Sequence, residues 1–247
     1  MRLAVILGST RTSAPPQILG GRVRLFLERS LARRKREFAE VDVIDPLNVK
    51  LPLLEKPHFA FPKGKAPADL DALHDRLACA DAYVTVSQPP RRNHPSVPRG
   101  MHRLTLPSPV HTPRPPKVTP EYNHTASPAL LNVLNHFGSS TFSYKPSAIC
   151  AYSAGQWGGS RAAIALRPVL SELGCLPVSA LVLLPKVQEI IDEAGVPADE
   201  QLYGYADRAW AQLAWWAAAC KNHREAVDPF AGSPAFTSTP SQRNTGV

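Results

Sequence analysis

Five short apolar runs recur along the chain, separated by segments with helical periodicity. The first run, Leu3–Leu7, is continuously apolar, which is typical of a central parallel strand buried on both faces. Strands that alternate with helices predict a parallel, doubly wound α/β sheet, because a crossover between parallel strands needs a helix-length connection. The predicted strands are Leu3–Leu7, Val41–Asp45, Ala82–Val86, Ser147–Ala151 and Val178–Leu184.

The segments between these runs complete the pattern. In the first of them Val23, Phe26 and Leu31 recur at helical spacing. Its basic end, Arg33–Arg36, suits the negative end of a helix dipole, so we interpret it as a solvated face rather than a binding site. In a sheet of this kind, ligands bind beyond the carboxyl ends of the strands. The predicted helices are Gln17–Phe38, Ala68–Cys79, Pro128–Phe137, Gly158–Leu173 and Asp199–Arg224.

Residues 86–117 break the alternation. Nine prolines and no periodicity predict an irregular insertion that cannot bury enough apolar surface to order itself. The segment carries six Lys and Arg residues and no Asp or Glu, so without it the formal net charge of +8 becomes +2. It also lacks the interleaved aromatic residues that stack on bases. We therefore expect no nucleic-acid partner.

Two origins of this insertion stay open: a native insertion and a translated, unspliced intron. Joining Thr85 directly to Val118 gives an uninterrupted strand that enters the next loop. We expect one domain over residues 1–225, interrupted at 86–117, and a disordered tail over 226–247, where Ser, Thr, Pro and Gly predominate.

Three loops that follow predicted strands carry the residues suited to a ligand. Gly8-Ser9-Thr10-Arg11 offers backbone amides at a helix start, two hydroxyls and a guanidinium, which is what a phosphate needs. In Thr119–Thr125, Pro120 stops a strand and a short polar turn follows. Tyr152–Gly159 is rich in small residues, so a flat ring could approach its backbone closely. Taken singly, each loop is also compatible with an ordinary turn between a strand and a helix.

Together, and in this order, the three loops resemble the NADPH-dependent FMN reductase family of quinone, azo-dye and chromate reductases. The resemblance implies a flavodoxin-like fold with strand order 2-1-3-4-5, with FMN as cofactor and NADPH or NADH as hydride donor. The family commonly has a serine at the position of Ala14, whereas here the hydroxyl is at Ser13, so Ser9 and Arg11 are the stronger phosphate candidates. The implied cofactor-binding residues are Ser9, Thr10, Arg11, Ser13, Pro120, Glu121, Tyr122, Asn123, Ser153, Ala154, Gly155, Gly158 and Gly159.

The resemblance implies an oxidoreductase that passes hydride from nicotinamide to flavin and then electrons to a quinone-like or other small acceptor. Glu121 is assigned positioning only, because the cofactor carries the redox chemistry and no catalytic side chain is needed. The alternative is a flavodoxin-like electron carrier or a non-catalytic flavin-fold interaction protein. Neither the acceptor nor the preference between NADH and NADPH follows from the residues.

The remaining sequence features concern the compartment, the metal content and the partners of the protein. The four cysteines have no CxxC or zinc-type spacing, and we expect reduced thiols in a cytoplasmic protein, with Cys150 in the core. No apolar run approaches a membrane span, so no membrane partner is expected. No metal site is predicted. The family likeness suggests a homodimer or homotetramer.

Overall fold

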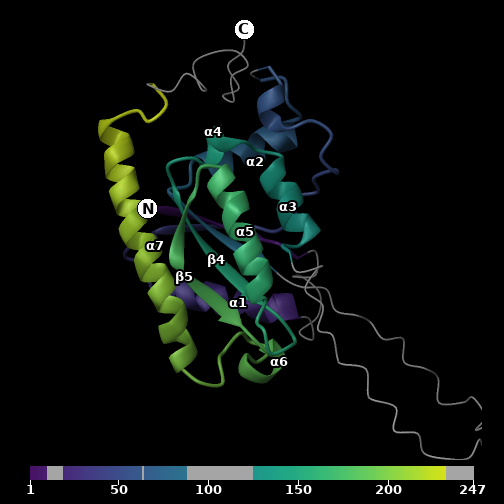
Figure 1. Cartoon of the computed structure of the whole chain (residues 1–247), viewed down its shortest axis with the longest axis vertical. Coiled ribbons are helices and arrows are strands. Elements are labelled where there is room, and N and C mark those ends of the chain that lie inside the picture. The colour runs from purple at the N-terminus through teal and green to yellow at the C-terminus, as the bar shows by residue number, and fades with distance from the viewer. Residues whose placement is uncertain (10–18, 63, 88–124, 232–247) are drawn as a thin grey trace, which may run out of the picture.

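The computed structural model describes residues 1–9, 19–62, 64–87 and 125–231. Within them, one five-stranded sheet has the order β2-β1-β3-β4-β5, and every neighbouring pair of strands is parallel. This confirms the predicted flavodoxin-like sheet and its strand order. The strands, seen in Figure 1, are β1 (Arg2–Leu7), β2 (Glu40–Ile44), β3 (Ala82–Ser87), β4 (Pro146–Tyr152) and β5 (Leu176–Leu184).

Helices cover both faces of this sheet, and each face has its own core. The longer helices are α1 (Leu19–Ala32), α2 (Ala68–Ala78), α3 (Pro128–Asn135), α5 (Ser160–Glu172) and α7 (Gln201–Ala226). Apolar residues of α1 and α7 pack on one face, and those of α2, α3 and α5 pack on the other. Alternate residues of β1 enter opposite cores, Val5 the first and Ile6 the second. A continuously apolar strand is therefore buried on both sides, as its sequence predicts.

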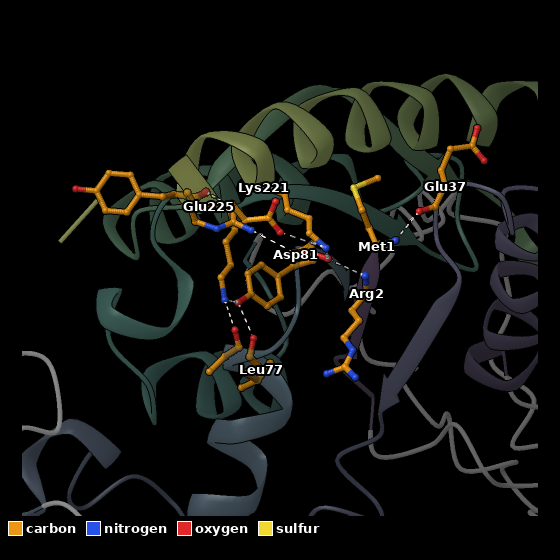
Figure 2. A network of polar contacts seen from close by, with 12 residues as sticks. Met1, Arg2, Glu37, Leu77, Asp81, Lys221 and Glu225 are labelled. Atoms are coloured by element: carbon orange, nitrogen blue, oxygen red, sulfur yellow. Dashed lines mark hydrogen bonds and ion pairs between the residues drawn. The ribbon is translucent and has the colours of Figure 1, made fainter. Parts of the chain in front are cut away.

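Charged groups gather at the opposite end of the sheet from the carboxyl ends of its strands. Asp81, which directly precedes β3, accepts a hydrogen bond from the backbone amide of Arg2 at 2.9 Å. It also pairs with Arg224 at 3.3 Å and Lys221 at 3.6 Å, both from the last turns of α7. Figure 2 shows Arg2 and Lys221 beside Asp81. They fasten the end of α7 to the start of β1 and β3.

Several predicted boundaries need correction. The first helix ends at Ala32 rather than Phe38, so the basic run Arg33–Arg36 lies in turns. Within this run, Arg34 pairs with Asp207 of α7 and, at 3.0 Å, with Glu37, which is a structural role. The other predicted strands and long helices lie within about two residues of their observed ends. Three short helices were not predicted: η1 (His58–Ala60), α4 (Ser139–Phe142) and α6 (Val187–Ile190).

The predicted limits of the insertion and the tail also change. Val86 and Ser87 belong to β3, where Val86 pairs with Leu7 and Cys150, so the irregular segment does not start at residue 86. α7 continues to Ala226, so the first residue of the predicted disordered tail is helical. The ring of Phe230 then packs edge-on against Tyr144, with centroids 5.3 Å apart.

Candidate functional site

The carboxyl ends of β1, β3 and β4 lie side by side, and buried serines follow or end each strand. Leu7 of β1 pairs with Val86 of β3, and Ser87 pairs with Ala151 of β4. The serines at these ends are Ser9, Ser87 and Ser153, which are 7 %, 0 % and 5 % exposed. The order of the sheet reverses direction here, because the chain adds β2 on one side of β1 and β3 on the other. Open α/β sheets bind ligands at such a point.

The exit from β1 requires a glycine. A Cβ on Gly8 would lie 2.5 Å from the carbonyl oxygen of Val86 and 2.6 Å from the hydroxyl oxygen of Ser127. That hydroxyl donates to the Gly8 carbonyl at 2.5 Å and accepts from the amide of Leu130 at 3.4 Å, which caps α3. One serine thus joins the first loop to the helix that follows the second.

The loop after β4 is fastened to the segment that follows β5. The backbone amides of Lys186 and Val187 donate to the carbonyls of Gly155 and Ser153 at 3.0 and 3.1 Å. The Gln188 side chain donates to the Ala154 carbonyl at 3.0 Å, and the Ser153 hydroxyl donates to the Gly155 carbonyl at 2.8 Å. Three successive carbonyls are therefore held on one side, which fixes the orientation of the peptides of this loop.

Two glycines then turn the chain into α5. Gly158 and Gly159 have φ angles of +58° and +77°, a region that favours glycine. A Cβ on Gly159 would also lie 3.0 Å from the Cβ of Ala151 and 3.1 Å from the amide nitrogen of Tyr152. Both glycines are therefore needed for the turn itself and for its close packing against β4 and the end of β5.

Ser87 is a site residue that the sequence analysis missed. Its hydroxyl is fully buried and has no hydrogen-bond partner within the described part of the chain. A buried hydroxyl without a partner costs free energy on the order of 1–3 kcal/mol. The signal in the sequence is a polar residue that ends an apolar strand at the switch point, but the predicted strand stopped at Val86.

Trp157 lies in this loop and is exposed. Its side chain is 50 % exposed, and the guanidinium of Arg161 lies 5.4 Å from its ring centroid. The cation over the ring limits how freely the indole can move.

The structure therefore brings together six of the predicted cofactor residues at one edge: Ser9, Ser153, Ala154, Gly155, Gly158 and Gly159. The other seven lie outside the described residues: Thr10, Arg11, Ser13, Pro120, Glu121, Tyr122 and Asn123. Two cavities of about 260 and 300 Å³ elsewhere in the described structure contain none of the thirteen.

One thiol lies close to this edge, two residues before the end of β4. Cys150 is buried in β4, as predicted, and burial raises the pKa of its thiol to about 12, so it stays protonated near neutral pH. Among the residues that the structure describes, no three His, Cys, Asp or Glu side chains form a group that could hold a metal. No helix in the described ranges has both the length and the apolar character needed to cross a membrane.

Comparison with known proteins confirms the resemblance. Residues 117–189 match the model of the NADPH-dependent FMN reductase family. This match includes the second and third loops and begins where the predicted insertion ends. No curated protein sequence matches the chain.

Solved structures share the fold at low identity. The flavoenzyme FerB, an NAD(P)H:(acceptor) oxidoreductase from Paracoccus denitrificans, is 19% identical, with a TM-score of 0.57 over 88% of this chain and 97% of its own. An oxidoreductase from Corynebacterium diphtheriae is 14% identical, with a TM-score of 0.52 over 89% of this chain and 98% of its own. RosB, solved with 8-demethyl-8-formylriboflavin-5'-phosphate, is 13% identical, with a TM-score of 0.51 over 98% of this chain and 94% of its own.

Proposed function

We propose that this chain is an FMN-dependent NAD(P)H oxidoreductase that reduces a quinone-like or other small acceptor. The observation that carries the proposal is the meeting of β1, β3 and β4 at one edge, because the three loops that resemble the FMN reductase family all follow these strands. The family match over residues 117–189 and the FerB likeness support it independently of the local chemistry.

The described residues at this edge fit a flavin. The Ser87 hydroxyl, buried without a partner, could bind a polar edge of a ring. Gly158 and Gly159 turn the chain into α5 with positive φ angles, and the loop before them is held by hydrogen bonds to its carbonyls. We infer that the amides of Ala154 and Gly155 face the ring. Trp157 stands beside the loop as a wall for the acceptor.

The phosphate end is assigned to the first loop. Ser9 directly follows Gly8, whose packing against Val86 holds the loop close to the sheet. Thr10 and Arg11 would then add a hydroxyl and a charge-assisted hydrogen bond to a dianion. Pro120, Glu121, Tyr122 and Asn123 would hold the ring from the other side, and Ser13 is the weakest phosphate candidate.

When bound, FMN supplies the two-electron redox chemistry, and the chain supplies binding, orientation and exclusion of water. No side chain of the described edge is a general base: its serines are neutral, and Cys150 is a buried thiol. We therefore assign no catalytic residue. Hydride donor and acceptor would use the same face in turn, which gives ping-pong kinetics.

Two measurements test this proposal. Purified protein should carry, or take up, FMN and show flavin absorbance. The loaded protein should then consume NADPH or NADH when menadione is supplied. Bound flavin without turnover would favour an electron carrier, and the absence of flavin binding would favour a non-catalytic interaction protein. Either result would overturn the enzymatic proposal.

A further inference from the structure

The middle of α7 is apolar around its whole circumference. Between Ala209 and Cys220, Gln212 is the single polar side chain. A helix with this composition is normally buried on all sides. Here one side is buried, through residues such as Trp210 and Leu213, but Trp215 and Trp216 are 64 % and 40 % exposed.

Contacts on the inner side fix which stripe of α7 faces outward. The Trp210 indole donates to the Ser30 hydroxyl of α1 at 2.8 Å, and Gln212 accepts from the amide of Ala180 in β5 at 3.0 Å. The opposite stripe follows helical spacing, and its residues are exposed or partly exposed; Figure 1 shows α7 as a whole along the edge of the molecule. We call it the outer stripe of α7: Gly204, Arg208, Ala211, Trp215, Ala218, Ala219 and Asn222.

This stripe is exposed. A Cβ on Gly204 would meet no atom of the described residues within 4 Å, so none of them packs against that position. Ala211 and Ala219 flank Trp215 by one turn on each side. Small residues around a large central one let a second helix approach closely, with the indole inserted between its side chains.

We propose that the outer stripe binds a second copy of this chain, with the two α7 helices antiparallel and related by a two-fold axis through Trp215. Such a contact uses the same patch on both copies. Ala211 of one copy then lies opposite Ala219 of the other. The two Trp215 side chains meet at the centre, where aromatic anchors contribute most to binding.

Charge complementarity selects the antiparallel arrangement. Arg208 lies before Trp215 and Glu225 after it, and the Glu225 side chain is 65 % exposed. An antiparallel pair brings Arg208 of one copy within about one turn of Glu225 of the other, at both ends of the contact. A parallel pair would instead place Arg208 beside Arg208, which is unfavourable.

A second copy fits this surface better than residues 232–247 of the same chain. Those residues contain Phe236 and Val247 as their only large apolar side chains. The helix has 26 residues and is therefore about 39 Å long and about 10 Å wide. The contact then covers about 400 Å² on each copy and about 800 Å² in total, below the roughly 1,200–2,000 Å² of a stable interface, so the association should be weak and depend on concentration.

Disulfide trapping tests the geometry. In the full chain carrying Cys79→Ser and Cys220→Ser, Ala211→Cys and Ala219→Cys are made separately, mixed and oxidised. Antiparallel pairing predicts a crosslink between the two different chains at least ten-fold faster than either chain forms alone, because two copies of residue 211 lie about 12 Å apart along the helix axis. An Ile164→Cys chain, exposed on α5, measures random collision.

Any other pattern overturns the proposal. Preferential crosslinking of the Ala211→Cys chain with itself would mean a parallel pair, and rates equal to that of the Ile164→Cys chain would mean no pairing. Crosslinking that appears only after removal of residues 232–247 would mean that the tail covers the stripe.

Sedimentation velocity supplies an independent check. Trp215→Glu should lower the association state, while Ile164→Glu, an equally exposed apolar site, should leave it unchanged. Both variants should melt near the wild-type temperature, since neither side chain is buried. An association state that Trp215→Glu leaves unchanged over the whole concentration range would refute the α7 contact.

Discussion

Lys145 is a buried ammonium group that pairs with no carboxylate among the described residues. It is 8 % exposed and donates to the carbonyls of Ala78 and Thr141 at 2.6 and 3.1 Å and to the Tyr83 hydroxyl at 3.1 Å. Burial, followed by the nearby charge of Arg224, lowers the pKa of Lys145 from 10.5 to about 8. Burial likewise raises the pKa of Tyr83. The buried Lys145 side chain therefore destabilises the folded protein whenever it is charged.

The sign of the resulting pH dependence follows from linkage. Between about pH 8 and 10.5 the unfolded chain holds a proton on Lys145 that the folded chain has released, so the unfolding free energy rises with pH over this window. The full effect is on the order of 3 kcal/mol. Below pH 8 the penalty is fully present.

Lys145→Met should remove this rise. Urea unfolding between pH 7.5 and 9.5 is the measurement, and the wild type should gain stability relative to the variant as pH increases. Lys35→Met, a matched change at an exposed lysine, should keep the wild-type pH dependence. Parallel curves for wild type and Lys145→Met would contradict the assignment.

Glu121 is the residue most easily mistaken for a catalyst. We assign it positioning only, so Glu121→Gln should retain turnover within about ten-fold while flavin stays bound. Steady-state kinetics with NADPH and menadione measures this. A loss in kcat of about 10²-fold or more with flavin retained would indicate general acid-base work instead.

At the scale of elements, the end of β3 determines how the second candidate ligand loop is attached to the sheet. Val86 and Ser87 complete the strand and pair with Cys150 and Ala151. The next candidate ligand loop starts at Thr119, preceded by Val118, so the sequence holds a second Val-hydroxyl pair that suits the same two strand positions. In a chain without residues 86–117, Val118 and Thr119 would occupy the strand positions of Val86 and Ser87. The loop would then continue directly from the sheet.

Deletion of Val86 to Lys117 should therefore strengthen FMN binding several-fold and raise Tm, because the flavin loop would be attached directly to a buried strand. Calorimetry and flavin fluorescence on the deleted and full chains measure the two effects. Weaker binding or a lower Tm after deletion would mean that the segment contributes to the fold or to the site.

Peptide mass spectrometry of the natural protein separates the two origins of the segment. The family match that begins at residue 117 is compatible with both origins, because either would interrupt the family sequence. A peptide spanning Arg99 to Arg114 in the natural protein would rule the intron out.

The elements were predictable where their apolar pattern is continuous. β1 and the order of strands and helices follow directly from buried runs. α4 and α6 could not be predicted, because four residues are too few for helical periodicity. The first helix was predicted too long because Phe38 is 1 % exposed yet lies after the turns that follow the helix, so its apolar character reflects packing rather than helix.

The candidate site was predictable in its glycines and serines but incomplete. Ser9 and the loop from Ser153 to Gly159 lie at the expected edge. The sequence could not indicate that Ser87 ends β3 as a buried hydroxyl without a described partner, because this depends on the register between β3 and β4. The fastening of the third loop by Lys186, Val187 and Gln188 likewise arises from tertiary contacts across β5.

On the scale of the whole molecule, the two ends of the sheet carry different kinds of residue. At one end, Asp81 and Lys145 hold α7 and β4 with charged and buried polar groups. At the other, glycines and serines leave backbone amides and small hydroxyls around the switch point. The outer stripe of α7 lies on a third surface, so self-association through it need not obstruct the candidate site.

Comparison of FMN with riboflavin tests the central claim most directly, because the two differ only in the phosphate assigned to Ser9, Thr10 and Arg11. Fluorescence titration of the apoprotein should give tighter binding of FMN. Arg11→Ala should weaken FMN about 10-fold or more, as expected for a charge-assisted hydrogen bond of roughly 1.5–3 kcal/mol, and leave riboflavin unaffected. Equal affinity of the wild type for FMN and riboflavin would contradict the assignment of this edge as an FMN site.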